Sequence, residues 1–211
     1  MTTPTASIPY PTWRFIYPPR PEAAVPPESL DSQEDRGWLC QPKLDGDCTL
    51  IFTDGAQVIV RNRRNEAYSK SFKFAASLTS LHRGERGKWT VVVAENMSKS
   101  KRSPDGSPWT DRLVIHDLLV VDGRHLMGTT FAERIALMDE MYGTEDSDQP
   151  ELMATGTDRV YRVRTHAAGF RQAFDRLTGA AEMYEGVVLK RAAGKLGPGI
   201  SVNCTSREII K

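Results

Sequence analysis

The stretch that decides the fold is Gln41-Pro42-Lys43-Leu44-Asp45-Gly46. It follows the apolar residues of a short strand-like run and places a lysine two residues before an aspartate and a glycine. An Asp-Gly pair by itself favours a turn. Taken alone, the segment therefore indicates a strand that ends in a bend, and its chemical meaning depends on the rest of the chain.

Charged side chains also stand at the ends of several later strand-like runs. Since the ends of strands converge on the rim of a sheet, where functional sites are built, we expect these side chains to gather around Lys43. They are Glu95, His116, Asp117, Glu185, Lys190 and Lys211.

Each of these residues also has a purely structural interpretation. Glu95 can be an acid satisfied within the sheet, and His116 can be an ordinary half-buried histidine. Asp45 can hold the local turn and position Lys43 without touching a substrate. Lys211 is the last residue of the sequence, where fraying is expected.

Hydrophobic periodicity predicts strands and helices in an irregular order. An α+β fold with largely antiparallel sheets and flanking helices follows, since strict alternation is absent. Two Asp-Gly pairs, at 54–55 and 122–123, predict tight hairpin turns of the type that needs positive φ. Helices are expected over 131–142, with a capping box from Thr130 to Glu133, and over 165–178. Strands are expected over 48–53, 57–61, 89–94, 113–121, 159–163 and 186–190.

The first thirty residues contain eight prolines, which are incompatible with a regular helix or a central strand. We therefore expect residues 1–36 to form a Pro-rich, partly ordered arm, and residues 37–211 to form the domain itself. Four aromatic residues indicate that part of the arm docks on the domain: Tyr10, Trp13, Phe15 and Tyr17.

Composition excludes few classes of protein. The three cysteines lack disulfide or metal-ligand spacing, and no apolar run approaches 18 residues, so a soluble intracellular protein without a membrane span is expected. The net charge is only +1, yet basic residues cluster locally. These clusters are either solvated faces or contacts for nucleic acid. They are Arg61, Arg63 and Arg64, then Lys70 and Lys73, then Lys99, Lys101 and Arg102.

In their order along 37–211, these segments resemble the adenylation domain of the covalent nucleotidyltransferases, which comprise ATP-dependent DNA ligases, RNA ligases and mRNA capping enzymes. Lys43-Leu44-Asp45-Gly46 is similar to the nucleophile motif, and 185–190 is similar to the motif Glu-Gly-hydrophobic-hydrophobic-x-Lys. The other similar segments are Arg64-Asn65-Glu66, Glu95, 115–119 with 130–134, and Lys211.

The resemblance implies a ligase-type fold in which Lys43 takes AMP from ATP as a covalent lysine adenylate. Such a lysine must lose its proton, which burial and neighbouring positive charge favour. Glu185, with Glu95, is expected to hold Mg²⁺ or Mn²⁺. The resemblance further implies ATP contacts for Gln41, Asp45, Gly46, Arg64, Glu95, His116, Lys190 and Lys211.

The acceptor of the AMP stays open between nicked DNA, which we favour, and RNA. Cys48 stands where DNA ligases commonly carry an arginine. A capping guanylyltransferase is a third alternative, and a degenerate nucleotide- or nucleic-acid-binding module is the non-enzymatic one.

The sequence stops at the last lysine motif, without the C-terminal OB-fold into which ligases usually continue. We therefore expect a monomer that works with a separate nucleic-acid-clamping domain or subunit. A compact enzyme of this kind is compatible with a phage or viral source.

Overall fold

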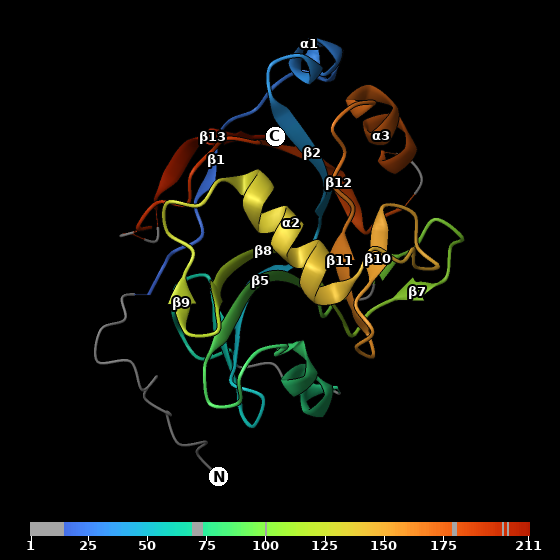
Figure 1. Ribbon diagram of the computed structural model, residues 1–211. Helices are drawn as coiled ribbons and strands as arrows, with labels where there is room; N and C mark the ends of the chain where they lie inside the picture. Colours follow the sequence, from blue (N-terminus) through green and yellow to red (C-terminus); the bar gives the residue numbers. More distant parts are fainter. Residues whose placement is uncertain (1–14, 69–73, 100, 179–180, 200, 202) are drawn as a thin grey trace.

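The computed structural model describes residues 15–68, 74–99, 101–178, 181–199, 201 and 203–211. The expectations for Tyr10, Trp13, Lys70 and Lys73 lie outside these residues. The described chain forms two main sheets, with helices α2 (Phe131–Tyr142) and α3 (Phe170–Leu177) against them (Figure 1). The α+β prediction, with largely antiparallel sheets and flanking helices, is confirmed.

The larger sheet has seven strands, and its central strands carry the buried apolar core. All its pairings are antiparallel except that of β11 with β8. In spatial order the strands are β10 (Leu152–Ala154), β11 (Val160–Val163), β8 (Arg112–Val121), β5 (Thr90–Met97), β3 (Asp47–Thr53) and β4 (Val58–Asn62), and β9 (Arg124–His125) pairs with β8.

The smaller sheet has four strands and carries the Lys43 segment on its edge strand. Its order is β1 (Arg20–Ala23), β13 (Thr205–Ile210), β12 (Tyr184–Arg191) and β2 (Trp38–Leu44). Pro42 is tolerated in β2 because proline, which lacks a backbone N–H, is compatible with an edge strand. A separate hairpin joins β6 (Lys101–Arg102) to β7 (Pro108–Trp109).

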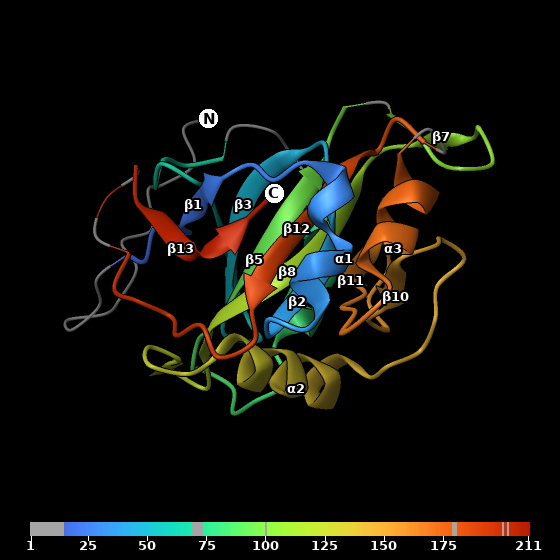
Figure 2. The same cartoon turned by 90° about the horizontal axis from the view of Figure 1, so that it is seen from above.

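The two long helices cover different parts of the structure (Figure 2). Helix α2 packs against β8, whereas α3 packs against β12 and β2. The predicted capping box of α2 is present: the Thr130 N–H donates to the Glu133 carboxylate at 2.6 Å, and the Glu133 N–H donates to Thr130 Oγ1 at 3.2 Å. Shorter helical segments lie at Pro27–Ser29 (η1), Asp31–Glu34 (α1) and Ala75–Leu81 (η2).

Two local predictions need correction. The helix expected from residue 165 begins only at Phe170, because Gly169 has a φ of +73° and the backbone of His166 pairs with that of Cys40 in β2. The 54–55 hairpin exists, but residues 54–57 connect its strands, and Gly55 rather than Asp54 takes positive φ. Asp54 instead accepts hydrogen bonds from two backbone N–H groups of the loop. The 122–123 turn has positive φ at both residues, as predicted.

The described part of the expected N-terminal arm, residues 15–36, packs closely on the domain. Ile16 and Leu30 are buried, and β1 pairs in parallel with β13 (Figure 1). The expected fraying at Lys211 is absent, because its N–H donates to the Ala23 carbonyl at 3.1 Å and its carbonyl accepts from Val25 at 2.7 Å. Among the described helices, none combines the length and apolarity needed to cross a bilayer.

Candidate active site

A cavity of about 560 Å³ lies between the two sheets. One wall comes from β2 and β12, where Lys43 pairs in register with Gly186, and Gln41 pairs with Val188. Because cross-strand partners share a face and side chains alternate along a strand, Gln41 and Lys43 lie on the same face of the smaller sheet. From the smaller sheet the lining includes Gln41, Lys43, Val188 and Lys190, and from the larger sheet Cys48, Val93, Glu95, His116 and Asp117.

Lys43, which lines this cavity, forms an ion pair with the partly exposed Glu185. Glu185 falls at a bulge between β12 and β2, beside Gly186 with a φ of +127°. A bulge re-aims the side chain of the strand that carries it, and here it turns the carboxylate toward Lys43. Glu185 lines a smaller cavity of about 190 Å³ together with Lys43 and Lys211, so Lys43 borders both spaces.

The pKa of the Lys43 amine lies below its ordinary value of 10.5, because burial disfavours its charge and because Lys211 adds a nearby positive charge. Glu95 and Asp45 oppose this shift. The structure therefore brings Lys43 and Lys211 together in the way that favours a neutral amine.

Glu95 and Gly46 meet at the end of strands β5 and β3. The Gly46 N–H donates to the Glu95 carboxylate, and burial raises the pKa of Glu95 to about 7. A Cβ at position 46 would lie 2.8 Å from the Asn96 carbonyl oxygen, so only glycine allows the chain to pass this close to β5.

The Asp45 side chain is absent from the described lining of either cavity. Its carboxylate instead accepts from Lys101, on the β6–β7 hairpin, and its backbone N–H donates to the Met183 carbonyl at 3.0 Å. This placement agrees with a role in holding the turn after Lys43.

Lys190 is tied into a buried ionic network. Its Nζ donates to the His116 carbonyl at 3.1 Å, lies 3.9 Å from Asp117 Oδ2, and lies 4.6 Å from the centre of the Phe131 ring. Arg134 holds Asp117 through two hydrogen bonds, at 2.7 and 3.2 Å. Burial lowers the pKa of Lys190 to about 8, although Asp117 opposes the shift.

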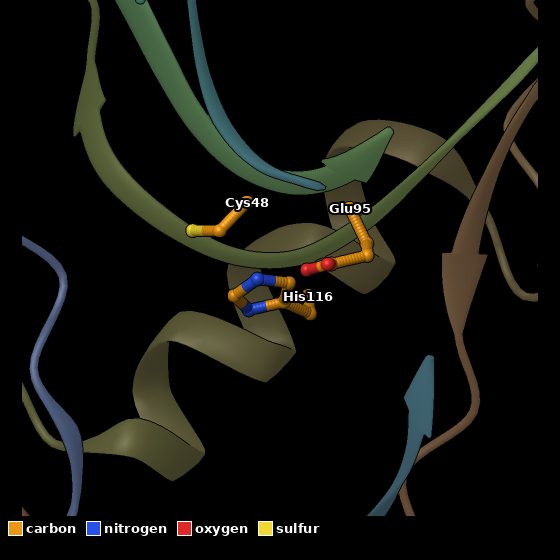
Figure 3. A group of neighbouring side chains, drawn as sticks. All are labelled: Cys48, Glu95 and His116. Atoms are coloured by element: carbon orange, nitrogen blue, oxygen red, sulfur yellow. The ribbon is translucent and has the colours of Figure 1, made fainter. Parts of the chain in front are cut away.

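His116 is an extra residue in β8. Ile115 pairs with Ala94 and Asp117 pairs with Val93, so His116 bulges out of the ladder between them. Burial and the charge of Lys190 lower the pKa of the imidazole to about 3, so it is neutral near pH 7. Its ring lies in the cavity beside Glu95 and Cys48 (Figure 3).

Of the predicted basic cluster Arg61, Arg63 and Arg64, Arg63 lines the cavity, whereas Arg64 is exposed outside it. Arg63 Nη2 donates to the Pro18 carbonyl at 2.6 Å, which ties the N-terminal arm to the cavity wall.

Sequence reasoning also assigned no site role to several other lining residues. The Pro18 region and the 194–199 segment come from parts of the chain that periodicity cannot place. The residues concerned include Phe131, Arg134, Pro18, Lys195 and Leu196.

The two carboxylates expected to hold Mg²⁺ have different surroundings. The Glu185 side chain is 41% exposed and faces the open space beside Lys43, which suits a hard cation that keeps several waters. Glu95 lies among a thiol and an imidazole, donors that Mg²⁺ disfavours. Glu185 is therefore the residue that fits Mg²⁺.

No family model matches the sequence, and neither does any curated protein. Solved structures do match. The ligase domain of M. tuberculosis LigD superposes with a TM-score of 0.63 at 20% identity, covering 90% of this chain and 57% of that one. A mycobacterial DNA ligase D complexed with ATP and MES gives 0.57 at 19% identity, covering 90% and 59%.

A third similar structure comes from work on Lig E DNA ligases and DNA binding with a minimal scaffold. It gives a TM-score of 0.54 at 14% identity, covering 93% of this chain and 68% of that one. The chain therefore has the adenylation-domain fold of ATP-dependent DNA ligases, as the motif resemblance implied. It spans less than two thirds of the ligase D chains.

Proposed function

We propose that this chain, with its ligase adenylation-domain fold, is a nucleotidyltransferase that carries AMP on Lys43 and passes it to a polynucleotide 5′-phosphate. The observation that supports this most strongly is the position of Lys43. Its amine borders a cavity between two sheets, is paired with the re-aimed Glu185, and has a lowered pKa through burial and Lys211.

In the first step the neutral Lys43 amine attacks the α-phosphorus of ATP. An N–P bond forms, the P–O bond to pyrophosphate breaks, and the lysine nitrogen, whose side chain is 27% exposed, releases one proton to solvent. Phosphoryl transfer depends mainly on positioning and on stabilising charge on the phosphate oxygens. Lys211, beside Lys43, is a candidate for the second task.

Magnesium held by Glu185 would neutralise part of the phosphate charge when bound. Glu185 also pairs with the Lys43 amine and so fixes its direction.

The base and sugar of ATP are assigned to the interior of the cavity. Gln41 is 2% exposed, and its side-chain amide donates to Thr165 Oγ1 at 3.0 Å, which fixes the orientation of the amide. A fixed amide can pair with the adenine edge, which offers both a donor and an acceptor. The neutral His116 ring supplies a surface for stacking on the purine.

After adenylation, the AMP passes to a 5′-phosphate, and a 3′-hydroxyl then displaces it to close the strand. Nicked DNA is the acceptor we propose, because two of the solved structures that share this fold are described as DNA ligases, one of them in connection with DNA binding.

The test uses the chain with Mg²⁺ and ATP labelled at the α-phosphate. We expect label that survives a denaturing gel in the wild type and is missing in Lys43→Ala. Absence of label from the wild type would favour a degenerate binding module, and label from GTP in place of ATP would indicate a capping enzyme. Transfer to nicked RNA but not nicked DNA would overturn the DNA acceptor alone.

A further inference from the structure

Three potential metal ligands of different chemistry meet inside the large cavity: the Cys48 thiol, the Glu95 carboxylate and the His116 imidazole (Figure 3). Their ligand atoms all lie within 4.8 Å of one another. We propose that they form a binding site for Zn²⁺, which, when occupied, closes the cavity to nucleotide.

The backbone places the three residues on adjacent strands of the larger sheet. Cys48 on β3 stands directly opposite Glu95 on β5. His116 occupies the bulge in β8, next to the Ile115–Ala94 pair. Backbone positions on hydrogen-bonded strands inside a sheet move little. The three residues therefore form a preorganised site and not a chance approach of surface groups.

The donor set matches zinc rather than magnesium. Zn²⁺ binds thiolate sulfur, imidazole nitrogen and carboxylate oxygen, whereas Mg²⁺ takes oxygen ligands almost exclusively. Zn–S bonds are about 2.3 Å long, and Zn–N and Zn–O bonds are about 2.1 Å long. In a tetrahedral site the ligand atoms therefore lie roughly 3.5 Å from one another. The ligand atoms, all within 4.8 Å of one another, must therefore approach by at most about 1.3 Å, which side-chain rotation allows.

The charges also balance. A thiolate and a carboxylate supply two negative charges for the dication, and the imidazole coordinates in its neutral form. Binding displaces the thiol proton of Cys48 into solvent. Neighbouring groups hold two of the ligands: the Gly46 N–H donates to Glu95, and Lys190 donates to the His116 carbonyl.

Three protein ligands leave the fourth zinc position open, and here it faces the cavity, as in sites that keep a water or exchangeable ligand. An ion there would stand where the proposed function places the adenosine of ATP. Inhibition by zinc therefore rests on the proposed function, whereas zinc binding itself does not.

Metal binding is tested first on the nucleotide-free chain, by competition with a chromophoric zinc chelator. We expect Cys48→Ser to weaken Zn²⁺ binding at least about a hundredfold. The matched control is Cys204→Ser, which removes a thiol that lines the same cavity outside the cluster and should leave the affinity unchanged. Equal affinity in wild type and Cys48→Ser would overturn the site.

Cobalt substitution needs no variant and covers the case in which Cys48→Ser fails to fold. Co²⁺ bound to the wild-type chain should give a thiolate-to-metal charge-transfer band and intense visible bands of a tetrahedral ion. Added Zn²⁺ should remove both. Visible bands of a six-coordinate ion without charge transfer would show that the thiol is not a ligand and would overturn the proposal.

The block on nucleotide is then measured as ATP labelling with and without Zn²⁺. Zinc should abolish labelling of the wild type and leave it largely intact in Cys48→Ser. If labelling is absent without zinc, the proposed function fails while the metal site stands on the two preceding measurements. If Zn²⁺ binds and ATP labelling of the wild type persists, the inference that bound zinc closes the cavity to nucleotide is wrong.

Discussion

Two lysines face one cavity from neighbouring strands, and the protein holds them in opposite ways. The side chain of Lys43 is 27% exposed, and that of its partner Glu185 is 41% exposed. Lys190 is only 10% exposed, and Asp117 beside it is 15% exposed. Burial and nearby charge lower the pKa of both amines. A lowered pKa alone therefore does not identify the nucleophile.

The two lysines differ in the contacts of their side chains. Lys190 is fixed by a carbonyl, a carboxylate and an aromatic ring. Lys43 is ion-paired with Glu185 and borders two cavities of the described structure. An attacking amine needs room for phosphorus on the line of its lone pair. We therefore propose Lys190 as a fixed charge and Lys43 as the reacting group.

The largest expected effect comes from Lys43→Arg. An arginine keeps the charge but stays protonated at any usable pH, so labelling by ATP should fall by more than about a thousandfold. Stability should change by less than about 1 kcal/mol, because the pair is partly exposed. The matched control, Lys88→Arg, alters an exposed ion pair and should label normally. Residual labelling near the wild-type level would contradict the assignment.

The second effect is on stability. Asp117→Asn leaves Arg134 and Lys190 buried without their shared carboxylate and should cost about 3 kcal/mol of unfolding free energy. Glu185→Gln, at the open pair, should cost less than about 1 kcal/mol. Urea unfolding of the two variants measures the contrast. Equal losses would show that burial does not distinguish the two networks.

The smallest effect concerns pH. Since a lowered pKa leaves more of the amine neutral at a given pH, labelling should rise with pH and level off below the ordinary lysine value of 10.5. Lys211→Met removes a positive charge that lowers this pKa, so the profile should move to higher pH by a few tenths of a unit. The profile is read from initial labelling rates. A shift of the profile to lower pH would contradict the role of Lys211 in lowering the pKa of Lys43.

Much of the fold followed from the sequence because local patterns agreed with tertiary packing. The α2 capping box and the 122–123 turn depend on neighbouring residues alone, and both form as predicted. The start of α3 did not follow, because His166 is drawn into pairing with Cys40, which lies far away in sequence.

The candidate site was predictable where strand alternation fixes direction. Lys43, Gln41 and Lys190 fall on one face of the smaller sheet by parity. Glu185 and His116 were expected near Lys43 from strand ends and motifs, but the bulges that place them change the parity and have no reliable sequence signature. The cluster of Cys48, Glu95 and His116 could not be predicted from the sequence for the same reason, since the β8 bulge brings His116 to the other two residues.

The most direct measurement of the central claim is mass spectrometry of peptides from the chain after incubation with ATP and Mg²⁺. A lysine adenylate at Lys43 predicts the added mass of AMP on the peptide that contains Lys43, and its loss on acid treatment, since the N–P bond is acid-labile. Peptides that contain Lys190 should remain unmodified. AMP on a Lys190 peptide, or no covalent AMP on any peptide, would contradict the account.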